Sequence, residues 1–156
     1  LRSAGSKCVL AGYRGWISIR FKRDIPMRSS RRNFVLYFDH GAGGGGPVTK
    51  GVISTARRAV YLPDADIVMT GHIHEAWAWP IARARFNSVT LQEYPDEQLH
   101  LCIPTYKEEF FGSAEGFHHE SERGPKPVGA WWIRFRMADE VNPRYDKIIY
   151  SVERAT

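Results

Sequence analysis

Two apolar runs on either side of an amphipathic segment constrain the fold of this chain more than any other feature. Residues 33–39 (NFVLYFD) and 65–70 (ADIVMT) are continuous and rich in β-branched and aromatic side chains, which is typical of strands buried on both faces. Residues 49–61 between them carry apolar side chains at helical spacing, and Pro63 ends that helix. The order strand–helix–strand predicts two parallel strands joined by a crossover.

The rest of the chain has the pattern of further strands. Residues 15–22 alternate apolar and polar side chains, as a half-exposed strand does. Residues 111–128 are rich in Gly, Pro, His and charge, and we expect a long surface loop there. The sequence therefore predicts an α/β fold, a β-α-β unit followed by mostly antiparallel strands, as one domain over residues 1–156 or the C-terminal part of a larger one. The later strands are expected at residues 79–86, 88–94, 98–103, 129–137 and 145–153.

Composition excludes several classes of protein. The chain has 156 residues, of which 43% are hydrophobic and 25% charged, as in a folded domain and not in a disordered segment. It contains no stretch of roughly 20 apolar residues that could cross a membrane and opens without the apolar core of a secretion signal. Its two cysteines form no CxxC motif, so a reducing cytoplasm is the expected location.

A mild excess of positive charge leaves the partner of the chain open. The formal net charge is +5, which favours contact with phosphates because each neutralised phosphate releases condensed counterions. Many domains of this charge bind no polyanion, and the basic residues stand in pairs and triplets that suit a solvated surface equally well. Nucleic acid is therefore a possible partner that the charge alone does not select.

A pair of histidines follows the second apolar run directly. His72 and His74 stand in the sequence GHIHE, at the carboxyl end of the expected strand, where ligands bind in open α/β sheets. In an extended segment, side chains two residues apart point to the same side. We therefore expect both imidazoles to reach into one site. An isolated His-x-His is more often a chance pair bonded to backbone, but its place at a strand end favours a ligand site.

His40 occupies the corresponding position after the first apolar run. If the two strands are neighbours in one sheet, His40, His72 and His74 converge at one edge. Neutral imidazole is the commonest protein ligand for Zn, Fe and Mn type ions. The sequence therefore predicts that these three histidines form a metal site.

The glycine run at residues 41–46 (GAGGGG) follows His40. Its spacing is that of a phosphate-binding P-loop, but Pro47 stands in place of the essential lysine, which excludes a nucleotide-binding P-loop. The glycines could instead let backbone approach a metal-bound phosphate, with donors from the start of the following helix; the alternative is a flexible linker. The predicted substrate-binding residues are Gly43, Gly44, Thr49, Lys50 and, in the long loop, His118, for which the alternative is a surface histidine.

These motifs resemble those of the calcineurin-like metallophosphoesterases, a family that includes phosphoprotein phosphatases and DNA-repair nucleases. The family has a His-Gly motif after a buried strand and later a Gly-His-x-His motif, which here look like His40-Gly41 and residues 71–74. The glycine-rich insertion and the sequence ADIVMTGHIHEAW look closest to those of phage and bacterial members of the family. The resemblance covers residues 33–80 by motif. It implies two packed mixed sheets with helices outside, and two divalent ions (Mn, Fe or Zn), with His40 and His72 on one and His74 on the other.

The chain also departs from the family pattern. The family opens with Asp-x-His, Gly-Asp and Gly-Asn-His-Asp/Glu motifs, which supply the other ligands, a bridging carboxylate and a catalytic histidine, and none of them is found here. Two divalent ions about 3.5–4 Å apart repel strongly without such a carboxylate. We interpret Asp39, which should point away from His40, as a structural or outer-shell group. Glu75 is either an outer-shell partner of a ligating histidine or an exposed charge.

The resemblance implies a metal-dependent phosphoesterase of which this chain is the C-terminal half. Such an enzyme hydrolyses a phosphodiester, of nucleic acid or a nucleotide, with a hydroxide activated by two metal ions. This chain supplies the histidine ligands, and a missing N-terminal half or a partner chain supplies the rest, so no catalytic residue is assigned within it. The alternative is a truncated, catalytically inactive module that binds metal or nucleic acid.

Overall fold

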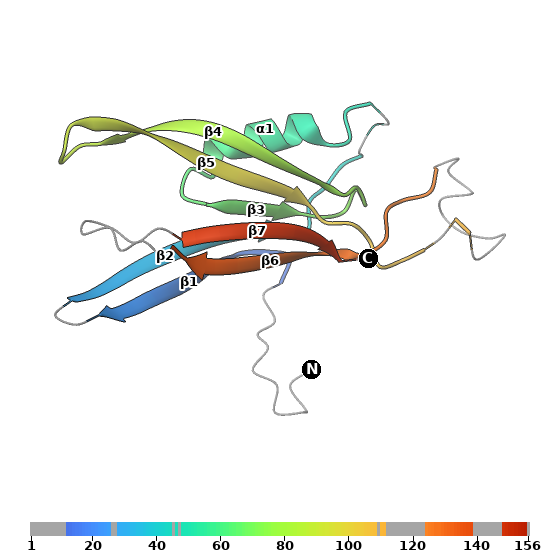
Figure 1. Ribbon diagram of the computed structural model, residues 1–156. Helices are drawn as coiled ribbons and strands as arrows, with labels where there is room; N and C mark the ends of the chain where they lie inside the picture. The colour runs from blue at the N-terminus through green and yellow to red at the C-terminus, as the bar shows by residue number, and fades with distance from the viewer. Residues whose placement is uncertain are drawn as a thin grey trace.

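The computed structural model describes residues 12–25, 28–44, 46, 48–108, 110–111, 124–138 and 148–155. Within these residues the chain is mostly strand, with a single helix (Figure 1). The elements in chain order are β1 (Arg14–Ile25), β2 (Arg28–Asp39), α1 (Val52–Tyr61), β3 (Ile67–Thr70), β4 (Trp77–Asn87), β5 (Gln92–Cys102), β6 (Ala130–Met137) and β7 (Ile148–Ala155).

Five of the strands form one mixed sheet in the order β1-β2-β3-β5-β4. Its three inner strands are parallel, with β3 hydrogen-bonded to β2 on one side and to β5 on the other. The edge strands β1 and β4 run antiparallel to their neighbours. The predicted α/β class is therefore confirmed, and so is the parallel pairing of the two apolar runs across a helical crossover.

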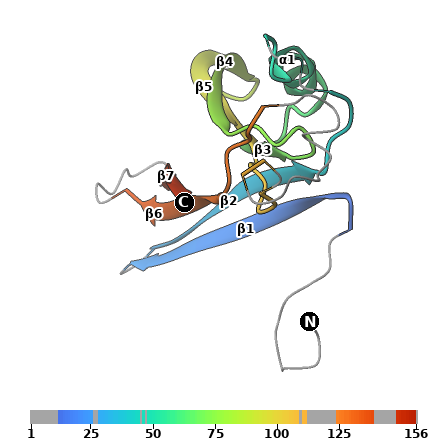
Figure 2. The ribbon, with the colours of Figure 1, turned by 90° about the vertical axis from the view of Figure 1, so that its right-hand side faces the viewer.

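The remaining strands, β6 and β7, form an antiparallel two-stranded sheet of their own. Side chains of both strands pack against a buried cluster on one face of the large sheet, and the Phe34 ring contacts the rings of Phe135 and Tyr150 edge to face. Figure 2 shows this pair on one side of the large sheet and α1 on the other. In the described part of the chain, the second layer is thus a two-stranded ribbon rather than a full second sheet.

Alternation along the inner strands explains why both faces of the large sheet are buried. On β2, Phe34 and Leu36 face the ribbon while Tyr37 faces α1, because successive side chains of a strand point to opposite faces. On β5, Leu99 and Leu101 join the ribbon side. The parallel strands therefore need apolar side chains at consecutive positions, as in the two runs of the sequence.

Helix α1 starts without a capping side chain. Gly51 at its N-cap position has φ 82°, makes no side-chain cap hydrogen bond, and is followed by a first turn without acidic residues. The left-handed backbone favours glycine there, and a Cβ at Gly51 would lie 2.5 Å from Cδ1 of Ile73, whose side chain would have to move. The helix buries Thr55, whose hydroxyl donates to the Gly51 carbonyl at 3.2 Å.

The prediction of separate strands at residues 88–94 and 98–103 is wrong. Residues 88–91 form a turn, because the Asn87 side chain accepts hydrogen bonds from the backbone N–H groups of Val89 and Thr90. The chain then continues as one strand, β5, through Pro95. Proline is tolerated there because β3 pairs with β5 only from Leu99 onward, so no ladder bond on that side is lost.

Two buried polar side chains, Gln98 and His100, connect β5 to the segment after α1. The Gln98 amide donates to the carbonyls of Leu62 (2.7 Å) and Ala65 (2.8 Å). Its oxygen is then the acceptor for Nε2–H of His100 at 2.8 Å, which fixes the imidazole tautomer. His100 is only 1% exposed, and burial, followed by the charges of Arg58 and Arg83, lowers its pKa to about 4. It is a structural residue.

Among the residues that the structure describes, no helix has the length and apolar character needed to cross a membrane.

Candidate functional site

His40 and His72 meet at the carboxyl ends of β2 and β3. The last residues of these strands, Asp39 and Thr70, are paired in register, so the residues that follow leave the sheet side by side. Nε2 of His40 lies 3.1 Å from Nδ1 of His72, and their ring centroids are 5.1 Å apart. Both side chains are exposed. The structure therefore brings together two of the three histidines singled out in the sequence.

Glycines allow the two histidine loops to approach so closely. Gly41 has φ +84°, and a Cβ on it would lie 2.9 Å from the Gly71 carbonyl oxygen. The backbone of Gly71 is in turn bonded to the end of β2, its N–H donating to the Asp39 carbonyl at 3.2 Å. Glycine at position 41 thus has a steric reason, because a side chain there would meet the backbone of the neighbouring loop.

The histidine loop is not extended, contrary to expectation. His72 and His74 have φ values of 71° and 55°, and the Ile73 N–H donates to the Gly71 carbonyl at 2.9 Å. This tight turn removes the simple two-residue alternation that would place both imidazoles on one side. His74 is half-buried and makes contacts of its own. In the described ranges, no three His, Cys, Asp or Glu side chains gather closely enough to hold a metal ion.

Asp39 holds the backbone around the histidines. Its Oδ1 accepts the Gly41 N–H at 2.7 Å and its Oδ2 accepts the Tyr37 hydroxyl at 3.2 Å. Burial, and after it the charge of Asp39, raise the pKa of the Tyr37 phenol, which therefore stays protonated as a donor. These bonds give Asp39 a structural role, one of the two interpretations offered by the sequence.

Glu75 is neither an outer-shell partner of a described imidazole nor an exposed charge. It forms an ion pair with Lys126, in which the Glu75 and Lys126 side chains are 13% and 19% exposed. A lysine 51 positions away could not be recognised as this partner from sequence. The neighbouring Cys102 is buried, which raises the pKa of its thiol to about 11, so it stays protonated and is a poor metal ligand.

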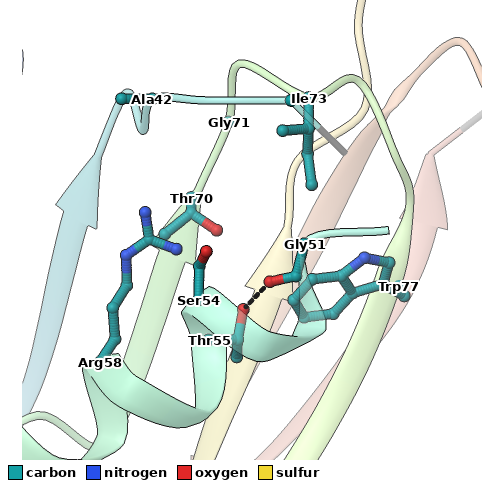
Figure 3. Close-up of a pocket in the computed structure, with 10 residues that line it drawn as sticks. Ala42, Gly51, Ser54, Thr55, Arg58, Thr70, Gly71, Ile73 and Trp77 are labelled. Atoms are coloured by element: carbon teal, nitrogen blue, oxygen red, sulfur yellow. Dashed lines mark hydrogen bonds between the residues drawn. The ribbon is translucent and has the colours of Figure 1, made fainter. Parts of the chain in front are cut away.

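A small polar cavity of about 20 Å³ lies between the start of α1 and the end of β3 (Figure 3). Arg58, Ser54 and Thr70 point into it. The Thr70 residue is 5% exposed. The space suits one water molecule or one oxygen atom of an anion, and the arginine and the uncapped helix start give it positive potential.

The cavity includes part of the predicted substrate-binding set. Gly44 lines it, whereas Gly43, Thr49 and Lys50 do not. Lys50 is exposed with φ 44°, and its carbonyl accepts the Trp77 indole N–H at 3.1 Å. His118 lies outside the described residues. Sequence reasoning missed Arg58 and Thr70, although Thr70 is the polar end of a buried strand, a signal that could have identified it.

Comparisons with models of known protein families, with curated proteins and with solved structures find no match for this chain. The family resemblance therefore rests on the motif residues themselves.

Proposed function

We propose that this chain is the histidine-bearing part of a metal-dependent phosphoesterase that acts on a phosphodiester. The observation that carries the proposal is the 3.1 Å separation of the His40 and His72 ring nitrogens. Two imidazole nitrogens each about 2.1 Å from one ion stand roughly 3.0–3.4 Å apart in octahedral or tetrahedral geometry. The separation of the two nitrogens therefore suits two ligands of a single divalent ion.

The polar cavity supports a phosphoryl ligand next to that pair. Ala42 and Gly71, each within two residues of a histidine of the pair, belong to its lining. Arg58 and the hydroxyls of Ser54 and Thr70 are donors in this lining, and α1 begins beside it without a side-chain cap. We propose that they hold one phosphoryl oxygen. When bound, divalent ions at such a site supply charge neutralisation and nucleophile activation.

The remaining ligands must come from residues outside the described ranges, from an N-terminal half or from a partner chain. We propose that His74 binds a second ion together with those groups. The same missing half would extend the β6–β7 ribbon into the second sheet of a complete two-sheet sandwich. The cytoplasm, suggested by cysteine usage, is the proposed location.

The incomplete set of ligands favours one other candidate. Within the described residues only His40 and His72 are placed as joint ligands, so the isolated chain could bind one ion, or nucleic acid, without catalysis. Such a module would bind its ligand but turn over no substrate.

Manganese-dependent hydrolysis of a generic chromogenic phosphodiester by the full chain tests the proposal. We expect His40→Ala and His72→Ala to abolish the activity, and Arg58→Gln to raise KM. Arg134→Gln, an exposed change on β6, is the matched control and should leave the rate unchanged. A folded chain that binds the ion but hydrolyses nothing would contradict a complete active site in this chain alone, and would leave it as the histidine-bearing half of one or as the non-catalytic module.

A further inference from the structure

The edge strand β1 presents a row of cationic and aromatic side chains beside the histidine pair. Its even-numbered side chains lie on the α1 side of the sheet, because Trp16 pairs with Tyr37, which packs with Leu62 on that side. Helix α1 does not cover β1, which lies at the outer edge of the sheet (Figure 2). We call these residues the β1 stripe: Arg14, Trp16, Ser18, Arg20 and Lys22, all of which are exposed.

The aromatic side chains of this region are held in place but remain open to solvent. Trp16 is 52% exposed, and its ring packs edge to face against the Tyr37 ring, with the two ring centroids 4.9 Å apart. Tyr13, just before the stripe, is 77% exposed, and its ring packs against the His40 ring with the two ring centroids 5.0 Å apart. The Tyr13 carbonyl also accepts the His40 N–H at 2.8 Å. The start of the stripe is therefore attached directly to the histidine pair.

The stripe carries three cations, Arg14, Arg20 and Lys22. Neither Arg14 nor Arg20 forms a salt bridge within the described residues. The carboxylate nearest in register, Asp39 opposite Arg14, is already bonded to Gly41 and Tyr37. A row of cations interrupted by an exposed indole is the composition of surfaces that follow a phosphate backbone while stacking bases.

We propose that the β1 stripe binds single-stranded nucleic acid and leads its phosphodiester backbone to the His40–His72 pair. The inference rests on the proposed function and names its substrate class. Stacking on Trp16 requires an unpaired base, because the faces of bases in a duplex are covered by their neighbours. Side chains on one face of a strand recur roughly every 6.6 Å, so the stripe is about 26 Å long and spans several nucleotides.

Binding of a fluorescein-labelled oligothymidylate to the full chain, followed by anisotropy in EDTA, tests the stripe without metal or hydrolysis. We expect Trp16→Ala to raise the Kd by about 5- to 100-fold, the usual effect of removing a stacking aromatic, and Trp16→Phe to restore much of the affinity. Trp132→Ala removes an indole that is 63% exposed on β6 and should leave the Kd unchanged. Circular dichroism establishes that each variant is folded.

Salt dependence tests the cations. Each of Arg14→Gln and Arg20→Gln should reduce the slope of log Kd against log salt by about 0.7, the value for one phosphate contact with a single strand. Arg134→Gln should not change the slope. Equal affinity for duplex DNA, equal affinity for polyglutamate, or equal losses in the Trp16 and Trp132 variants would overturn the proposal.

The two proposals can fail separately. Oligothymidylate binding that depends on Trp16, in a chain without hydrolytic activity, would support the β1 stripe and contradict hydrolysis by this chain alone. Hydrolysis of a small phosphodiester that depends on His40, in a chain that binds no oligothymidylate, would contradict the stripe alone.

Discussion

Nε2 of His40 lies 3.1 Å from Nδ1 of His72 although 32 positions separate the two residues in the chain. The parallel pairing of β2 with β3 makes this possible, because it ends both strands at the same edge of the sheet. In the absence of an ion, one nitrogen donates a hydrogen bond to the other. When an ion is bound, both nitrogens use their lone pairs as ligands. Metal binding and the hydrogen bond therefore exclude each other.

Calorimetric titration with Zn²⁺ or Mn²⁺ should detect one ion per chain held by this pair. We expect His40→Ala and His72→Ala each to weaken binding by at least about tenfold, because even the loss of a residue that only supports a ligand has an effect of this size. His74→Ala should have a smaller effect, because His74 is not gathered with the pair in the described structure. An equally large loss in His74→Ala would mean that the loop rearranges around the ion.

Gly41→Ala should destabilise the chain more than Gly43→Ala. Both glycines have a positive φ, +84° and +85°, but only at Gly41 would a Cβ meet another group, the Gly71 carbonyl at 2.9 Å. The left-handed backbone costs roughly 1–2 kcal/mol in either variant, and the contact adds about 1 kcal/mol or more for Gly41. Urea unfolding followed by circular dichroism measures the difference. Equal unfolding free energies would show that the loops separate freely.

The ion pair of Glu75 and Lys126 should contribute to stability and not to metal binding. Both side chains are largely shielded from solvent, so Glu75→Gln or Lys126→Met alone leaves a poorly hydrated charge and should cost about 2 kcal/mol. The double variant should recover part of that loss, and a double-mutant cycle in urea isolates the coupling. A change in Zn²⁺ affinity in Glu75→Gln would contradict this assignment.

Stability should fall as the pH is lowered from about 6.5 to about 4. The pKa of His100 is depressed to about 4 by burial and by Arg58 and Arg83, so below its ordinary value the unfolded chain binds a proton that the folded chain does not. The contribution is complete above pH 6.5 and is lost progressively down to pH 4. It amounts to about 3 kcal/mol at most.

The control for this pH dependence is His100→Gln, which removes the titrating group and keeps an amide donor toward Gln98. Its unfolding free energy, measured in urea at several pH values, should vary less between pH 4 and 7 than that of the parent chain. If the two chains showed the same dependence of unfolding free energy on pH, a group other than His100 would be responsible for it.

Sequence by itself determined the features that depend on local chemistry and on the period of apolar side chains. The apolar side chains at consecutive positions in residues 33–39 and 65–70 are removed from water only in strands that are buried on both faces. Two such strands on either side of a helix therefore followed from the sequence. The positions of His40 and His72 directly after these strands followed from the same pattern. The continuous strand β5 did not follow from the pattern, because Pro95 is tolerated within it only where β3 does not pair.

Tertiary structure decided everything that depends on which distant groups meet. Lys126 as the partner of Glu75 and Arg58 beside Thr70 depend on packing between segments far apart in the chain. The left-handed backbone of His72 and His74 depends on contacts with the neighbouring loop, which local spacing does not encode. Side-chain periodicity fixes which way a strand faces, whereas loop geometry is set by the residues against which it packs, and these are known only once the chain has folded.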